Sequence, residues 1–257
     1  MIARREFLVS AFAAGLSVAS DVPVRKAKVA RLFKSPDGHP NGLENTPEGL
    51  WIGEQVTDRA WLVDWSGKVL KRVETESSNT SGIAYGGGFL WMAANGKAIG
   101  RPAKPADTAT GEIVKVDPAT GKTVARYPVP GGGGVHGLEF VEGTLWITSL
   151  ALQKLSQVNA GDFRVIHQIP VRLSRAHGLA WDPPAIWVMH SNDRVVHKLD
   201  AKDGRLLEVV ALAKDDPDPH GMCMHEGHLY YCDAGIAPQG VSNESPWAGY
   251  VCRIDLA

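Results

Sequence analysis

Short apolar runs separated by turn residues recur along the chain in one fixed register. Five segments open with a polar residue, a glycine and an apolar residue, at Asn41-Gly42-Leu43, Ser81-Gly82-Ile83, His136-Gly137-Leu138, His177-Gly178-Leu179 and His220-Gly221-Met222. Ten residues after each leading polar residue comes an aromatic residue, at Trp51, Trp91, Trp146, Trp187 and Tyr230. This pattern predicts pairs of strands joined by tight turns.

A third anchor completes each repeat. An apolar residue followed by Asp or Asn ends a later strand, at Val63-Asp64, Val116-Asp117, Val158-Asn159, Leu199-Asp200 and Ile254-Asp255. Turn residues such as Ser66-Gly67 follow, and then another alternating strand. Each repeat is therefore predicted to be a four-stranded antiparallel meander of about 40 residues, the size of one propeller blade.

Five such repeats predict an all-β protein, a five-bladed β-propeller. The fifth repeat reaches Ala257 after its third strand, while residues 22–33 precede the first repeat and form a lone predicted strand. We expect this N-terminal strand to complete the fifth blade and close the ring, because an unpaired edge strand is a liability. The aromatic residues at one fixed register are interpreted as packing between blades.

Two repeats carry about a dozen extra residues between the aromatic and the acidic anchor. These insertions span about residues 95–111 and 234–249. They leave from the end of the blade at which the first strand begins. We expect them to lie over that mouth of the channel as lids.

The first twenty residues are predicted to be an export signal. Arg4 and Arg5 precede a mostly apolar stretch that ends in small residues, which resembles the twin-arginine motif; a general secretory signal is the alternative. The predicted propeller domain spans residues 21–257, and the predicted location is periplasmic or secreted. Three cysteines, Cys223, Cys232 and Cys252, allow one disulfide or remain buried thiols.

Composition narrows the range of partners. The formal net charge is -1, with 44% hydrophobic and 21% charged residues and no run of like charge. The sequence shows no cluster of like charge that would favour binding to nucleic acid or, after export, to a membrane surface. A small-molecule substrate is therefore the expected partner. The protein is expected to be a monomer.

The first strand of each predicted blade lines the channel, and the second strand returns to the face where the first began. Two sets of residues therefore meet at one rim: the five leading residues, and the residues three past each aromatic, which are Glu54, Ala94, Ser149, His190 and Asp233. His136, His177 and His220 from adjacent blades are candidate ligands of one divalent metal ion, which would be zinc, manganese, iron or magnesium. Alternatively, the leading position requires only a polar hydrogen-bonding residue, as Asn41 and Ser81 suggest.

Two phrases carry a family resemblance. Residues 136–149, HGLEFVEGTLWITS, and residues 49–54, GLWIGE, are similar to blades of the streptogramin B lyase (virginiamycin B lyase) group and its gluconolactonase-like relatives. Blades of that group commonly read Pro-His-Gly-Ile and then Gly-x-x-Trp-Phe-Thr-Glu. The resemblance covers nearly all of the chain from Asn41 to Ala257. It implies metal-assisted elimination by His and Glu on this rim, with Glu54 matching the family's glutamate and the three leading histidines matching its histidines.

The predicted number of blades points to a second group. The lyase has seven blades, whereas this sequence predicts five. In this number the chain resembles the bacterial glutaminyl cyclases, whose Gly-Leu-x-x-x-x-Gly-x-Leu-Trp blades are also similar. We therefore expect a metal-dependent lyase, or a hydrolase, acting on an ester, lactone or glycosidic C–O bond, in which His190, Glu54 and Asp233 move the proton. The alternatives are a glutaminyl-cyclase-like enzyme and a non-enzymatic propeller that binds a ligand or peptide.

Overall fold

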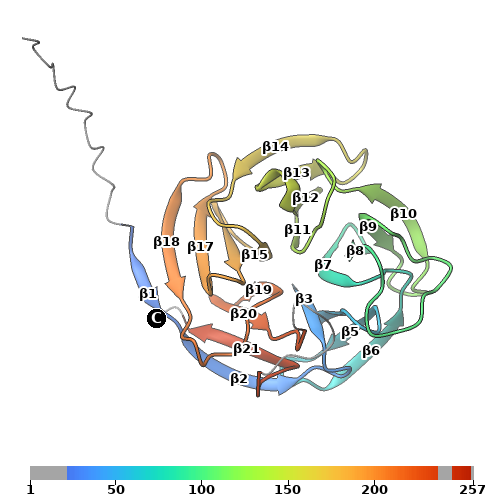
Figure 1. Ribbon diagram of the computed structural model, residues 1–257, viewed down its shortest axis with the longest axis horizontal. Coiled ribbons are helices and arrows are strands. Elements are labelled where there is room, and N and C mark those ends of the chain that lie inside the picture. The colour runs from blue at the N-terminus through green and yellow to red at the C-terminus, as the bar shows by residue number, and fades with distance from the viewer. Residues whose placement is uncertain (1–21, 237–244, 256–257) are drawn as a thin grey trace, which may run out of the picture.

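The computed structural model describes residues 22–236 and 245–255 and places them in five sheets arranged around a central axis (Figure 1). The prediction of an all-β five-bladed propeller is confirmed. The predicted export signal lies outside the described residues, as does the middle of the second insertion.

The first three blades follow one another along the chain, and each is a four-stranded antiparallel sheet. Blade 1 contains β3 (Pro40–Thr46), β4 (Gly49–Glu54), β5 (Arg59–Val63) and β6 (Val69–Glu74). Blade 2 contains β7 (Thr80–Gly86), β8 (Phe89–Asn95), β9 (Gly111–Val116) and β10 (Thr123–Pro128). Blade 3 contains β11 (Leu138–Val141), β12 (Thr144–Ser149), β13 (Lys154–Asn159) and β14 (Val165–Pro170).

The last two blades both include strands from the N-terminal segment. Blade 4 contains β15 (Ala176–Asp182), β16 (Ala185–His190), β17 (Val195–Asp200), β18 (Leu206–Ala211) and β1 (Val24–Lys26). Blade 5 contains β19 (Met222–His225), β20 (His228–Cys232), β21 (Tyr250–Asp255) and β2 (Lys28–Lys34).

The N-terminal segment closes the ring as predicted, and it also pairs with a second blade. β2 pairs antiparallel with β21, with Val29 opposite Ile254, and so supplies the missing outer strand of blade 5. The segment is not one lone strand, however, because β1 pairs in parallel with β18 of blade 4. It therefore ties two blades together at the point where the ring closes (Figure 1).

Buried apolar clusters lie between neighbouring blades. There are five among the described residues, and each combines side chains from two adjacent blades; one example joins Trp187 of blade 4 to Tyr231 of blade 5. The indole side chains of the register tryptophans are buried. These contacts confirm the interpretation of the aromatic register as packing between blades, where large rings remove most apolar surface from water.

Close backbone contact explains the glycine of the repeat. A Cβ atom at any of these five glycines would lie closer than 3.0 Å to the backbone of the next blade, as found for Gly42, Gly82, Gly137, Gly178 and Gly221. The inner strands therefore meet in a glycine ring, which we define by these five residues. Only glycine permits such an approach. The leading residues precede this ring, and the rest of each inner strand follows it.

Helical structure is nearly absent from the described residues, which contain one short 3-10 turn, η1 (Leu150–Leu152), and no helix long and apolar enough to cross a membrane. Cys223, Cys232 and Cys252 are all free and buried. The alternative of buried thiols therefore holds, and none of the three cysteines forms a disulfide.

Candidate functional site

The three leading histidines come together at the channel. The rings of His136 and His177 stack with their centroids 4.4 Å apart and 22° between their planes. The ring of His220 meets His177 edge to face at 5.0 Å and 84°. We call these three side chains the histidine cluster. Its members precede or begin the inner strands of blades 3, 4 and 5, so the register of the repeat is what assembles it.

Burial keeps the histidine cluster uncharged. It lowers the pKa of His136 to about 3 and the pKa of His177 well below its ordinary value. Burial also lowers the pKa of His220, an effect that the nearby Asp218 and Asp233 oppose. At neutral pH all three imidazoles are therefore neutral, which is the form that accepts a proton or donates a lone pair.

Several nitrogens of the cluster have no protein partner. Both ring nitrogens of His177 and Nδ1 of His136 are buried without a hydrogen bond, while Nδ1 of His220 lies 3.2 Å from the carbonyl oxygen of Asp218. A buried polar atom without a partner costs free energy, so such atoms mark a place where a ligand or water belongs. The unpartnered nitrogens of the cluster can therefore form hydrogen bonds with a polar ligand.

The cluster does not fit a metal ion in the arrangement observed. Within residues 22–236 and 245–255, no three His, Cys, Asp or Glu side chains are placed to hold one metal ion. A zinc site would need three nitrogens at about 2.0–2.1 Å from one point. Ring proximity alone does not meet this requirement.

The other two leading residues are part of a hydrogen-bonded chain. Asn41 donates to Gln55 at 2.7 Å, and Gln55 donates to Asn79 at 2.7 Å. Ser81 donates to the carbonyl oxygen of Asn79 at 3.2 Å. This half of the rim is linked by side-chain hydrogen bonds, although Oδ1 of Asn41 has no partner among the described residues, whereas the histidine half has no such chain there.

Glu54 lies apart from the histidine cluster in its contacts. Its Oε2 accepts a hydrogen bond of 2.8 Å from the backbone N–H of His39, in the segment before β3. Leu50 and Ile52, on the same face of β4, pack against blade 5. Burial raises the pKa of Glu54 to about 7, so this carboxyl group gains or loses its proton near neutral pH. Its contacts place it between blades 1 and 5.

His190 forms a separate histidine pair. Its ring lies 4.6 Å from that of His197, edge to face, and both of its ring nitrogens lack a hydrogen-bond partner. Burial lowers the pKa of His190 to about 4. Sequence reasoning did not single out His197, because it lies on the third strand of its blade, away from the rim.

Asp233 organises the loops on either side of β20. It is fully buried and accepts hydrogen bonds from the backbone of Asp218 at 2.9 Å and of Gly235 at 3.0 Å, and from the hydroxyl of Ser245 at 2.6 Å. Through Asp218 it adjoins His220. Of the three predicted proton-transfer residues, Asp233 is thus the one beside the cluster.

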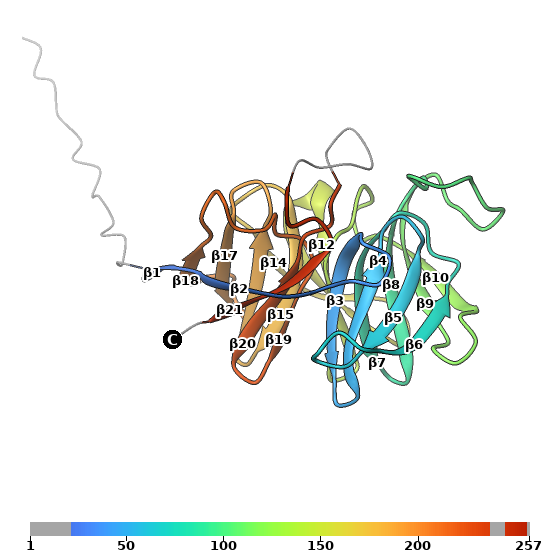
Figure 2. The same ribbon diagram turned by 90° about the horizontal axis from the view of Figure 1, so that it is seen from below.

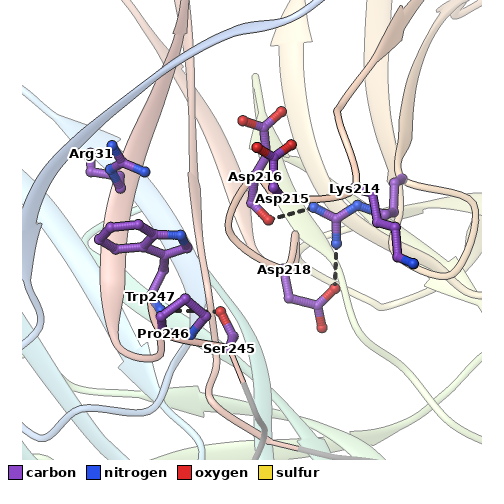
Figure 3. Close-up of a pocket in the computed structure, with 9 residues that line it drawn as sticks. Arg31, Lys214, Asp215, Asp216, Asp218, Ser245, Pro246 and Trp247 are labelled. Atoms are coloured by element: carbon purple, nitrogen blue, oxygen red, sulfur yellow. Dashed lines mark hydrogen bonds and ion pairs between the residues drawn. The ribbon is translucent and has the colours of Figure 1, made fainter.

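A cleft of about 700 Å³ is lined in part by Asp218, whose carbonyl oxygen lies 3.2 Å from Nδ1 of His220 (Figure 3). It is lined by Arg31, Arg194, Lys214, Asp215, Asp216, Asp218, Ser245, Pro246 and Trp247. The guanidinium group of Arg31 lies 3.8 Å from the centre of the Trp247 ring. The volume suits a small organic molecule. Sequence analysis missed this cleft, although the charged run from Lys214 to Asp218 was a signal.

The first insertion is anchored to blade 1. Nε of its Arg101 lies 2.7 Å from Oδ2 of Asp58, whose side chain is fully buried, and the same guanidinium group pairs with Asp107. Figure 2 shows this insertion and the described part of the second one on the same side of the propeller, opposite the β3–β4 hairpin. The insertion that we expect to act as a lid is therefore anchored to a neighbouring blade by an ion pair.

Comparison with known proteins supports the fold. No family model matches the chain, and no curated protein matches it. The glutaminyl cyclase of Myxococcus xanthus has a similar structure, with a TM-score of 0.69 and 10% identity over 91% of this chain and 98% of that one. A streptogramin B lyase matches with a TM-score of 0.51 and 18% identity over 87% and 75%. The WD40 propeller domain of Doa1 matches with a TM-score of 0.52 and 14% identity over 92% and 94%.

These likenesses confirm that the chain is a propeller like those of streptogramin B lyase and glutaminyl cyclase. At these identities they speak for the architecture alone, because one propeller fold serves many unrelated functions. The chemistry must therefore be argued from the residues of this chain.

Proposed function

We propose that the protein is an enzyme that breaks a C–O bond of an ester, lactone or glycosidic substrate, by elimination or hydrolysis, at the histidine cluster. The observation that carries the proposal is the burial of His177 between two other imidazoles with both ring nitrogens unpartnered. The adjacent cleft provides room for a substrate.

His220 is the imidazole best suited to accept a proton. The carboxylates of Asp218 and Asp233 favour its protonated form, whereas His136 and His177 lack such partners. Once protonated, His220 can return the proton to the leaving oxygen, and the neutral His177 can hydrogen-bond to the substrate. Proton transfer of this kind contributes typically 10²–10⁴-fold to the rate. Direct roles for Glu54 and His190 remain predictions, since their contacts lie elsewhere.

The bound divalent ion, whether zinc, manganese, iron or magnesium, also remains a prediction. The observed side-chain arrangement does not fit it, so binding would require the imidazoles to reorient. Metal analysis of purified protein tests this separately. About one ion per chain, lost in His136→Asn, would support the prediction, and absence of metal from an active enzyme would contradict it.

The test of the enzyme is a panel of esters, lactones and glycosides assayed with the parent protein and with His177→Asn and His220→Asn. Absorbance of a conjugated double bond reports elimination, and release of acid reports hydrolysis. We expect both variants to lose at least about a hundredfold in kcat/KM. His167→Asn, on β14 of blade 3, is the control and should retain activity. Full activity in both cluster variants would overturn the proposal.

A glutaminyl-cyclase-like activity is the second candidate. The glutaminyl cyclase shares its architecture with this chain, at a TM-score of 0.69 over 98% of the cyclase, so its activity is included as a reaction to test. A peptide with an N-terminal glutamine belongs in the same panel. Binding of a panel compound without any turnover would instead favour the non-enzymatic propeller.

We further propose that the protein is exported to the periplasm or secreted, and that the mature chain is a monomer. Arg4 and Arg5 before an apolar stretch support export by the twin-arginine route. Replacing both arginines by lysine should leave the protein in the cytoplasm, and unchanged export of this variant would contradict the route. Light scattering of the exported protein tests the monomer.

A further inference from the structure

A second polar cavity lies on the other side of the glycine ring from the histidine cluster. The inner strands carry Glu44, Glu139 and Cys223 two residues beyond the ring glycine. These side chains line a cavity of about 170 Å³ together with Asn45, Trp181 and Met224. The glycine ring separates the leading residues from these positions along each strand. The cavity is thus a compartment of its own.

The two carboxyl groups in this cavity are an unusual pair. The exposed fraction is 7% for Glu44 and 9% for Glu139, so both are more than nine-tenths buried. Each accepts one backbone N–H, from Tyr85 and Trp181 respectively. Oε2 of Glu44 has no hydrogen-bond partner. Within the described part of the chain, no ion pair involves either carboxyl group.

Burial makes ionisation of the pair costly. Burial, and secondly the proximity of Glu139, raises the pKa of Glu44 well above its ordinary value. Burial raises the pKa of Glu139 to about 8. The thiol of Cys223 is the other titratable group of the cavity, and burial raises its pKa as well. Among the described residues no cation compensates the two buried carboxyl groups, so binding of a positively charged ligand would lower the free-energy cost of ionising them.

We propose that this cavity binds a small organic ammonium ion, such as a short aliphatic amine. The Glu44 and Glu139 carboxylates would accept its N–H groups, including at the unpartnered Oε2 of Glu44. The indole of Trp181 offers a cation–π partner, and Met224 offers an apolar contact for the carbon chain. The volume equals that of roughly six water molecules, which admits only a few heavy atoms.

A bare metal ion fits the cavity less well. Within the part of the chain that the structure describes, no three His, Cys, Asp or Glu side chains are placed to hold one ion, and this includes Glu44, Glu139 and Cys223. An ammonium ion needs only hydrogen-bond acceptors and an apolar wall. Its binding would displace a proton from a carboxyl group, so affinity should rise with pH below the pKa of that group.

The experiment is calorimetric titration of the parent protein with ethylammonium chloride, in phosphate or borate buffer that contains no amine. Ethanol serves as the uncharged analogue. We expect one ethylammonium per chain, at least tenfold weaker binding in Glu44→Gln and Glu139→Gln, and binding that strengthens from pH 6 to pH 9. Glu48→Gln, an exposed charge at the neighbouring β3–β4 turn, should bind like the parent.

Several results would overturn the proposal. They are no ethylammonium binding by the parent protein, equal binding of ethanol, unchanged binding in both cavity variants, or a stoichiometric divalent ion that these two variants lose. The test is independent of the proposed enzyme, because His177→Asn should bind ethylammonium like the parent. Circular dichroism confirms that each variant is folded before titration.

Discussion

Gly137 packs directly against the carbonyl group of His177: a Cβ atom on Gly137 would lie closer than 3.0 Å to that oxygen. The same contact brings the first strands of blades 3 and 4 together below two members of the histidine cluster. The cluster therefore depends on a backbone approach that only glycine allows.

Gly137→Ala should destabilise the protein strongly. The obstructing atom is backbone, which cannot rotate away as a side chain can. We expect a loss of at least about 3 kcal/mol in the free energy of unfolding, the upper range for overpacked sites. Urea denaturation measures it.

Gly161→Ala provides the comparison for this prediction. At Gly161 the nearest atom to an added Cβ is Oδ1 of Asn159, a side-chain atom, at 3.1 Å. This substitution should cost less than about 1 kcal/mol. Equal effects of the two substitutions would show that the glycine ring is not tightly packed.

Glu139→Gln should stabilise the protein at alkaline pH. In the unfolded chain this carboxyl group ionises near its ordinary pKa of 4.5, whereas in the folded protein it holds its proton up to about 8. Between these values the unfolded state binds fewer protons, so folding stability falls as pH rises. The glutamine variant lacks this loss.

Thermal melting at pH 5 and pH 9 in amine-free buffer tests the sign. The gain in Tm of Glu139→Gln over the parent should be larger at pH 9 than at pH 5 by at least about 2–4 °C, which corresponds to about 1 kcal/mol. Glu48→Gln should show no such trend. A gain independent of pH would mean that the carboxyl group is ionised normally in the fold.

Arg101→Ala should destabilise blade 1 although Arg101 belongs to an insertion. Asp58 is fully buried, accepts two hydrogen bonds of 3.0 Å from Thr80, and has Arg101 as its cation. Removing one partner of a buried ion pair costs about 3–5 kcal/mol, because the other charge stays buried.

Two further variants separate this pair from general loop effects. Lys97→Ala, an exposed change in the same insertion, should leave Tm unchanged. Adding Asp58→Asn to Arg101→Ala should restore much of the stability, since the amide carries no charge. If Arg101→Ala melts like Lys97→Ala, the ion pair contributes little.

The sequence register could predict the blades and the histidine cluster because both follow from position within one repeat. The aromatic residues fix where each second strand packs, and the leading residues fix what begins each inner strand. The predicted strand over residues 22–33 contains β1, but its pairing with blade 4 escaped prediction because the parallel partner β18 lies far along the chain.

The second strands bring Glu54 and His190 to the end of the blade where the leading residues lie, opposite Pro40 and Ala176, and the alternation of these strands decides which way the two side chains face. Glu54 follows Leu50 and Ile52 at even spacing, and these face the neighbouring blade. His190 likewise follows Ile186 and Val188. Period two therefore turns these polar residues to blade interfaces. The pairing of Arg101 with Asp58 has no sequence signal, because its partners lie 43 residues apart in different blades.

The last prediction concerns the acid stability of the histidine cluster. An unfolded histidine binds a proton near pH 6.5, whereas burial holds the pKa of His136 at about 3 and that of His177 well below 6.5 in the folded protein. As pH falls from 6.5 toward 3, the unfolded state binds more protons than the folded state, so these residues lower the stability.

The double variant His136→Asn/His177→Asn should lack this acid sensitivity. Replacement leaves cavities and removes contacts, but this cost in stability does not depend on pH. The buried carboxyl groups change stability with pH in the opposite direction, and subtracting the parent's free energy of unfolding at each pH removes their effect. Relative to the parent, the variant should therefore gain stability as pH falls from 7 to 4, by more than about 1 kcal/mol for each pH unit that the cluster resists protonation. Urea denaturation at pH 4, 5, 6 and 7 measures this difference. A flat difference would show that the cluster titrates as exposed histidines do, and so is open to water rather than held neutral in the channel.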